Sequence, residues 1–258
     1  MKTYISRGTI CFPGPYGLTY RICDLAYYLN DNETFHYVFT PNYSVIGLLE
    51  GTSFQGIPGL NLDLKKKEYV RADKIPTFIS ERVPGENRED LQELLVKVGL
   101  DYMDPIEYLI RTDEQYFGDP LFVLPYREKN EFAMREEASH KTNAALMKEA
   151  LTHICDGDDV LFFGQQIDDS NRSAFHKVLL SMYARAYEQS KETQAEGIAK
   201  AAVEGKYKGR KPVHVDRMMF LDVLASVERK EITPKEGAHK LGISIDKYYR
   251  YKKQLMTR

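Results

Sequence analysis

Residues 233–253 read TPKEGAHKLGISIDKYYRYKK, and this stretch decides the fold of the C-terminal part. Thr233 and Glu236 have the spacing of a capping box, with a proline at the first helical position. Gly242 suits the left-handed residue that ends a helix, and Ser244 can cap the helix that follows. The stretch therefore predicts a short helix, a tight turn and a second helix that is basic and aromatic.

A first helix is predicted directly before this stretch, over residues 215–228. Its apolar side chains recur at helical spacing, which is typical of a helix with one face on a core: Met218, Met219, Leu221, Val223, Leu224 and Val227. Short helices with a glycine turn before the last one form the helix-turn-helix pattern. The alternative for residues 213–258 is a small helical interaction domain with a charged face.

The third predicted helix carries the candidate DNA contacts. A recognition helix enters the major groove by its N-terminal end, so we expect the first residues to face base edges. These candidates are Ile245, Asp246 and Lys247, with the capping Ser244 beside them. Tyr249 is expected to pack or to reach a phosphate, and the phosphate candidates are Arg250, Lys252 and Lys253.

Residues 205–212, GKYKGRKP, form a basic arm between the predicted helices. Glycines and a proline keep the arm out of both neighbouring helices. An extended cationic segment suits the minor groove, where arginine inserts readily. The alternative is a solvated linker between two domains. The cations of the arm are Lys206, Lys208, Arg210 and Lys211.

The net charge of −2 conceals opposite charges in two parts of the chain. Residues 196–258 contain 15 Lys and Arg against 8 Asp and Glu, a net charge of +7, which leaves −9 for residues 1–195. A basic tail on an acidic body indicates a polyanionic partner for the tail. We therefore expect double-stranded DNA as the partner of the C-terminal part.

Composition and cysteine usage indicate a soluble intracellular protein. With 43% hydrophobic residues, 18 Tyr and 12 Phe, the chain is rich enough in apolar side chains for a folded core. Cys11, Cys23 and Cys155 lack CxxC spacing, as expected of buried thiols in a reducing compartment. The first residues contain no apolar signal core, and no run reaches membrane-spanning length. We expect a cytoplasmic protein without membrane contact.

We expect no cofactor and no metal. His140 and His153 have no companion ligand at suitable spacing. The acidic residues at 156–159 are better explained as a turn before a strand than as a calcium loop. A glycine-rich phosphate loop followed by Lys and Ser or Thr does not occur in the sequence.

Residues 1–126 are expected to form a small mixed α/β module. Alternating apolar residues predict strands at 35–40 and 60–64, and the apolar run 121–124 predicts a closing strand. Leucines at helical spacing predict a helix over residues 87–98. Asp104 followed by a proline is typical of a helix start.

Residues 127–204 are predicted to form a mainly helical connector. It contains a helix-prone stretch at 131–154, an apolar strand at 160–163 and a long helix at 171–204. A helix of this length favours a partner along one face, so we expect a homodimer through it. The alternative is a core helix that ends earlier and continues as a linker. The expected fold class is α+β, with a small N-terminal module, a long connecting helix and a C-terminal three-helix domain at 213–258.

Parts of the tail resemble the C-terminal end of serine recombinases of the resolvase/invertase family. They are EGIAKA at 196–201, GKYKGRKP at 205–212, and LGIS at 241–244 followed by Tyr249 and Arg250. The resemblance implies that the long helix supports a dimer, the arm lies in the minor groove and the helix-turn-helix reads the adjacent major groove. The catalytic Tyr-x-Arg-Val-Ser motif of that family is missing, because residues 4–8 read YISRG. Since strand cleavage needs a nucleophile and guanidinium groups, we expect no recombinase activity.

The N-terminal part is similar, in order and spacing, to the N-terminal subdomain of HipA-type proteins. The similar segments are FHYVF at 35–39, GIPGLNL at 56–62, PTFISERVP at 76–84 and DPIEYLIRT at 104–112. In that family the subdomain sits on a kinase-like toxin domain and meets antitoxin partners. The kinase part is missing here, so the resemblance implies a recognition or regulatory module with a protein partner.

The sequence favours a non-enzymatic, sequence-specific DNA-binding protein, such as a regulator or an accessory factor of a mobile element. One alternative is a toxin–antitoxin component whose N-terminal module binds a HipA-like partner. Another is a recombinase with an unrecognised catalytic domain, for which Ser6 is the residue to test.

Overall fold

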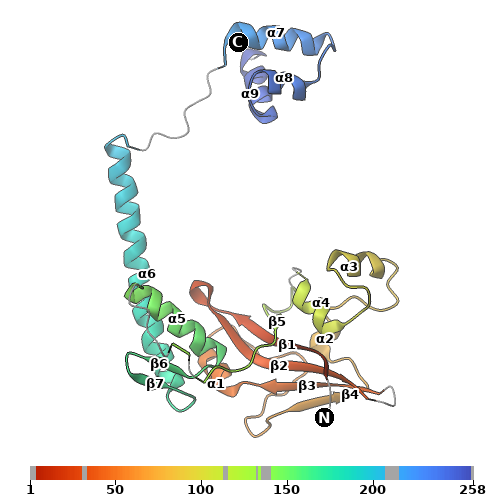
Figure 1. Ribbon diagram of the computed structural model, residues 1–258, viewed down its shortest axis with the longest axis vertical. Helices are drawn as coiled ribbons and strands as arrows, with labels where there is room; N and C mark the ends of the chain where they lie inside the picture. Colours follow the sequence, from red (N-terminus) through yellow and green to blue (C-terminus); the bar gives the residue numbers. More distant parts are fainter. Residues whose placement is uncertain are drawn as a thin grey trace. The chain divides into compact units, whose positions relative to one another are not determined.

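The chain divides into two compact units, Met1–Glu192 and Thr193–Arg258, each described by itself (Figure 1). The first unit contains an antiparallel sheet with helices, and the second is helical. The expected α+β class is thereby confirmed. The computed structural model describes residues 4–30, 34–112, 116–131, 133–134, 141–206 and 215–256.

A five-stranded antiparallel sheet forms the base of the first unit, with the order β4-β3-β2-β1-β5. Gly8 in the inner strand β1 lies where a Cβ would approach Val123 to 2.7 Å and Ile106 to 3.1 Å, so the close packing there requires glycine. The strands predicted near residues 35 and 121 are confirmed as β3 and β5. The strands are β1 (Tyr4–Pro13), β2 (Thr19–Leu29), β3 (Phe35–Pro41), β4 (Tyr69–Ala72) and β5 (Phe122–Pro125).

One face of this sheet carries much of the core. Ile10, Leu25 and Phe39 are fully buried on adjacent strands, as expected where every second side chain points to the same face. The helices α2 (Thr77–Ser80) and α4 (Pro105–Arg111) contribute apolar side chains to the same cluster. The other short helices before β5 are η1 (Pro15–Gly17), α1 (Tyr43–Ile46), η2 (Gly47–Leu49) and α3 (Leu91–Lys97).

Asp104 caps α4, as its position before a proline predicts. Its Oδ1 accepts hydrogen bonds from the amides of Ile106 and Glu107, both at 3.0 Å. The same oxygen accepts from the buried Ser6 hydroxyl at 2.9 Å. Ser6 therefore anchors the start of α4 to strand β1.

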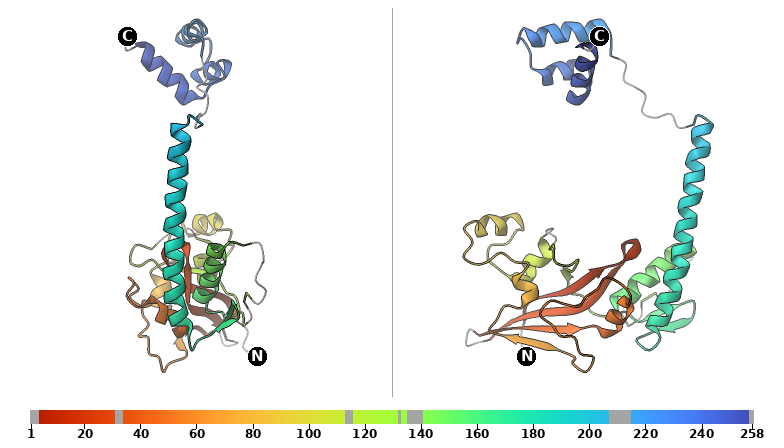
Figure 2. Two further views of the ribbon diagram at one scale, coloured as in Figure 1. Left: turned by 90° about the vertical axis from the view of Figure 1, so that its left-hand side faces the viewer. Right: turned by 180° about the vertical axis from the view of Figure 1, so that it is seen from behind.

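The helix α5 (Asn143–Asp156) packs on β2 and α1. Thr142 caps its start by accepting from the Ala145 amide, and Gly157 ends it in the left-handed conformation, with φ of 84°. A two-stranded hairpin of β6 (Val160–Phe162) and β7 (Gln165–Ile167) follows. Two views in Figure 2 show α5 and the first turns of α6 together at one end of the sheet.

The first residue of α6 (Arg172–Val203) is almost completely buried, with 1% of its surface exposed. The guanidinium of Arg172 donates to the Gly157 carbonyl at 3.2 Å and also to the Asp158 carbonyl. It forms ion pairs with Asp159 at 3.1 Å and Asp169 at 2.9 Å. A cation at the C-terminal end of a helix is favourable, so Arg172 ties α6 to the end of α5.

The long helix predicted over residues 171–204 is confirmed by α6, which has 32 residues. Its first turns are buried at His176, Leu179 and Tyr183. Residues 188–200 are all exposed. Gly197 within this stretch has open space around it and does not interrupt the helix.

The second unit also contains α7 (Arg217–Glu228), α8 (Pro234–Lys240) and α9 (Ile245–Met256). These are the helices that the sequence predicts for the helix-turn-helix. They share a small core around Phe220, Val223 and Tyr248.

Residues 60–64 form a loop, so the strand predicted there is wrong. The Tyr69 hydroxyl accepts from the Asp63 amide at 2.6 Å and donates to the Asn61 carbonyl at 2.8 Å. A side chain thus satisfies backbone groups that a neighbouring strand would otherwise satisfy.

Two predicted helices are shorter than expected. The helix predicted over 87–98 is limited to α3, where Gly99 follows with a φ of 72°. The helix predicted over 131–154 begins only at Asn143. Ala133 instead forms a bridge with Val160, because its amide donates to the Asp159 carbonyl and its carbonyl accepts from Leu161.

The first unit continues well past residue 126, where the sequence placed the end of the first module. Ile10 and Leu151, on either side of that position, belong to one core cluster. Most of the predicted connector therefore belongs to the first unit, up to Glu192. Among the residues that the structure describes, no helix has the length and hydropathy needed to cross a membrane.

Candidate nucleic-acid interface

The helix α8 begins with the capping box that the sequence predicts. The Thr233 amide donates to Glu236 Oε2 at 2.7 Å, and the Glu236 amide donates to Thr233 Oγ1 at 3.3 Å. Hydrogen bonds from the Thr233 amide and hydroxyl lower the pKa of Glu236. The start of α8 is therefore held by a charged, reciprocal cap.

The turn between α8 and α9 contains Gly242 with a φ of 64°. The Ile243 amide donates to the Ala238 carbonyl at 3.0 Å, and the Gly242 amide donates to the His239 carbonyl at 3.0 Å. This pattern closes a helix through a left-handed glycine. Ser244 follows, and its hydroxyl accepts from the Lys247 amide at 3.4 Å, which is a long contact for a cap.

Gly237 allows α7 and α8 to approach each other closely. A Cβ at this position would lie 2.9 Å from Val223 Cγ1 and 3.3 Å from Val227 Cγ2. Asp216 caps α7 by accepting from the Met219 amide at 2.9 Å. These local features fix the two helices on which α9 rests.

The two faces of α9 differ in burial. Ile245, Tyr248 and Tyr251 lie at a spacing of three residues and pack on the small core. The opposite face is exposed and forms what we call the α9 stripe: Asp246, Tyr249, Arg250 and Lys253. The helix thus presents a polar, largely cationic surface that is backed by apolar packing.

Ile245 is the one base-edge candidate whose placement differs from the expectation. It packs on the core of the second unit and is half-buried. The base-edge candidates in exposed or partly exposed positions are Ser244, Asp246 and Lys247.

Tyr249 is on the exposed side of the helix, with 53% of its surface accessible. Its ring meets the Tyr248 ring edge-on, at a centroid distance of 5.7 Å and an angle of 81°. The sequence suggests two roles for Tyr249, packing and phosphate contact. Its ring packs against Tyr248, and its exposure is compatible with a phosphate contact as well. Arg250 and Lys253 are exposed beside it, and Lys252 is half-buried.

Most of the basic arm lies outside the described residues, including Lys208, Arg210 and Lys211. Lys206 is described and exposed, and its ammonium group pairs with Glu204 at 2.6 Å. That side chain is 73% exposed, so the ion pair is a weak surface contact.

Tyr248 is the central side chain of the small core and is fully buried. Its hydroxyl has no hydrogen-bond partner among the residues that the structure describes. Burial, with the nearby Tyr249 and Glu228, raises the pKa of Tyr248. The hydroxyl therefore stays neutral and plays no part in charge recognition.

One cluster of possible metal ligands occurs in the first unit and was not expected from the sequence. Ligand atoms of His153, Asp156 and Asp158 lie within 4.8 Å of one another. Arg127 pairs with Asp156 at 2.9 Å and with Asp158 at 2.7 Å, and His153 contacts Asp158 at 2.8 Å. Cationic side chains already hold these carboxylates, so the cluster is an ion-pair network at the end of α5. His140, the other histidine considered, lies outside the described residues.

The pKa values in this network follow from the same contacts. Burial disfavours the Asp158 carboxylate, but hydrogen bonds from His153, Arg127 and the Asn130 amide outweigh it and lower its pKa. Burial raises the pKa of Asp156, against the opposing effect of Arg127 and of Arg21. His153, Asp156 and Asp158 lie within six residues of one another, but sequence spacing could not show that Arg127 pairs with the two carboxylates.

No family model, curated protein or solved structure matches the chain. The resemblances to serine recombinases and to HipA-type proteins therefore stay predictions.

Proposed function

We propose that the chain is a sequence-specific DNA-binding protein that acts through α8, α9 and the basic arm. The α9 stripe is the observation that carries this proposal. It combines two cations, a tyrosine and a single carboxylate on one exposed helix face. A helix with this surface, held after a tight turn by a small core, suits the major groove.

Within this proposal the two halves of α9 have different roles. Asp246 and Lys247, in the first turn, are the side chains that read base edges, because that end of a recognition helix enters the groove. Arg250 and Lys253 lie further along the exposed face and bind phosphates. Ile245 supports the helix from its buried side.

The arm adds contacts that do not depend on base sequence. Arg210 and Lys211 suit the minor groove, whose negative potential attracts cationic side chains. Replacing both by Ala is expected to weaken binding to every DNA sequence to a similar extent.

We also propose that α6 pairs with a second copy of the chain. Residues 188–200 are exposed all round, and an isolated helix of that length is marginal in water. Exposed apolar side chains occur along α6 at Val178, Met182 and Ile198, with exposures of 57%, 52% and 47%. Val178 and Met182 lie four residues apart on one face of α6, and a partner helix would cover them. Sedimentation of the full chain, with Met182→Glu as the variant, tests this pairing.

A selection from random duplex DNA tests the main proposal. The full chain is expected to enrich one motif, and Lys247→Ala is expected to relax base preference at one or two positions by about 1–3 kcal/mol each. Lys235→Ala, an exposed lysine of α8, is the matched control and should retain the motif. If no motif is enriched, or if both variants behave alike, the assignment of α9 as the reading helix fails.

A further inference from the structure

The first unit contains a cavity of about 640 Å³ between the end of α4 and the segment that leads into β5. Its volume is in the range of small-molecule sites. Leu109, Ile110 and Leu121 form an apolar wall. Glu81, Arg82 and Asp119 also line the cavity and are its charged side chains among the residues that the structure describes.

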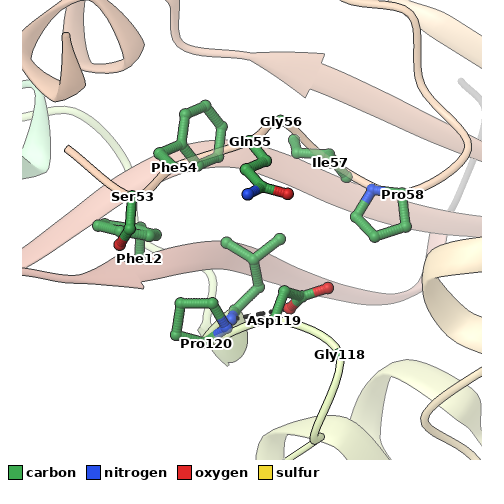
Figure 3. A pocket seen from close by; sticks show the side chains of 11 residues that line it. Phe12, Ser53, Phe54, Gln55, Gly56, Ile57, Pro58, Gly118, Asp119 and Pro120 are labelled. Atoms are coloured by element: carbon green, nitrogen blue, oxygen red, sulfur yellow. Dashed lines mark hydrogen bonds between the residues drawn. The ribbon is translucent and has the colours of Figure 1, made fainter. Parts of the chain in front are cut away.

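A second cavity of about 360 Å³ shares the segment 119–121 as a wall (Figure 3). Phe12 and Phe54 form part of its apolar lining, with their rings edge to face at 5.6 Å. Figure 3 shows the Gln55 amide pointing into this space, toward the side of Asp119. Both cavities therefore combine apolar walls with a few polar groups around one short segment.

Arg82 is fixed in the wall and not free to bind a ligand anion. Its guanidinium lies 4.2 Å from the ring centroids of both Phe78 and Tyr116. It pairs with Asp119 and donates to the Phe78 carbonyl at 2.9 Å. The side chain is 5% exposed, and its buried Nε has no acceptor among the described residues.

Tyr116 can cover Arg82 only because residue 118 is glycine. A Cβ on Gly118 would lie 2.3 Å from Tyr116 Cε1. The sequence at this point thus favours one ring position, in which the tyrosine lines the cavity and stacks on the guanidinium.

The charged groups of the cavity do not cancel. Asp119 neutralises Arg82 directly, whereas the Glu81 carboxylate lies 3.7 Å from Arg82 and is 37% exposed. Among the described residues, the lining therefore carries one negative charge in excess, on Glu81. A carboxylate in a partly desolvated cavity attracts a cation and repels an anion.

We propose that this cavity binds a small amphipathic cation, with its ammonium group at Glu81 and its apolar body against Leu109, Ile110 and Leu121. Such a ligand would balance the charge and cover apolar surface at the same time. This site is independent of the proposed DNA-binding function, because all of its lining residues belong to the first unit.

Calorimetric titration of the full chain with phenethylamine and with phenylacetate tests the proposal. The two probes have similar apolar bodies and opposite charges. We expect saturable binding of phenethylamine with one site per chain, and at least tenfold weaker binding of phenylacetate. Glu81→Gln should weaken phenethylamine binding about tenfold, and Ile110→Trp, which fills the cavity, should abolish it.

Glu93→Gln serves as the matched control, because Glu93 is an exposed carboxylate outside the lining and should leave binding unchanged. Circular dichroism spectra of all variants show whether they fold. Equal affinity for both probes, no binding of phenethylamine, or binding that survives Glu81→Gln and Ile110→Trp in folded protein would overturn the proposal.

Discussion

The Arg172 guanidinium donates a hydrogen bond to the carbonyl oxygen of Gly157 at 3.2 Å and so joins the start of α6 to the end of α5. Gly157 itself is in the left-handed conformation that ends α5. This contact anchors the first residue of α6 within the first unit.

Replacing Arg172 by Leu is expected to destabilise the first unit by about 3 kcal/mol or more, because carbonyls and carboxylates lose a buried partner. Hydrogen exchange of α5 amides under increasing urea measures the loss. The control is Arg88→Leu, whose ion pair with Asp90 involves a side chain that is 55% exposed. That pair is worth less than about 1 kcal/mol. Similar effects of the two variants would contradict the role given to Arg172.

Lowering the pH is expected to destabilise the first unit, because it protonates the buried His176. Burial, with a smaller contribution from Lys177, lowers the pKa of His176 from 6.5 to about 4. Its ring lies 3.0 Å from the Tyr20 hydroxyl. Because the unfolded chain binds a proton more readily, stability is lost as the pH falls from 6.5 toward 4.

Between pH 6.5 and pH 4, the expected loss in the free energy of unfolding is on the order of 2–3 kcal/mol. His176→Gln keeps a hydrogen-bonding group and does not titrate there, so urea unfolding of this variant should depend less on pH over that range. An identical pH dependence in the variant and the original chain would rule out His176 as the cause.

Two glycines in helices should respond oppositely to alanine. Gly197 lies in the exposed part of α6 with open space around it, so Gly197→Ala should stabilise the helix by about 0.5–1 kcal/mol. Gly237→Ala places a Cβ 2.9 Å from Val223 and should destabilise the second unit by about 1–3 kcal/mol. Thermal unfolding followed by circular dichroism distinguishes them, and a stabilising Gly237→Ala would refute the close approach of α7 and α8.

Tyr248→Phe should leave the second unit equally stable or raise its stability by about 1 kcal/mol. The variant removes a buried hydroxyl that has no partner among the described residues and keeps the ring that fills the core. Tyr249→Phe is the exposed comparison and should change little. A clear loss of stability in Tyr248→Phe would indicate that its hydroxyl has a partner.

Local signals allowed the second unit to be predicted well. Caps and turns involve neighbouring residues, so Thr233, Glu236 and Gly242 could be interpreted from sequence alone. The burial of Ile245 depends on where α9 rests, and one-dimensional spacing does not contain that information.

Contacts between distant residues account for the features that sequence reasoning missed. Arg172 binds the end of α5, Arg127 joins the acidic cluster, and Arg82 pairs with Asp119, 37 residues away. Each involves a cation whose partner is set by tertiary folding. Residues 60–64 form a loop instead of the predicted strand because the side chain of Tyr69 supplies hydrogen bonds to their backbone, which residue alternation does not indicate.

The salt dependence of DNA binding tests the central proposal most directly. Each phosphate contact contributes about 0.9 to the slope of log K against log salt concentration. Arg250→Ala with Lys253→Ala removes two cations of the α9 stripe, and Arg229→Ala with Lys230→Ala removes two exposed cations after α7. The account predicts that the first pair lowers the slope by about 2 and the second leaves it unchanged. Equal slopes for both double variants, or no salt-dependent binding by the full chain, would contradict it.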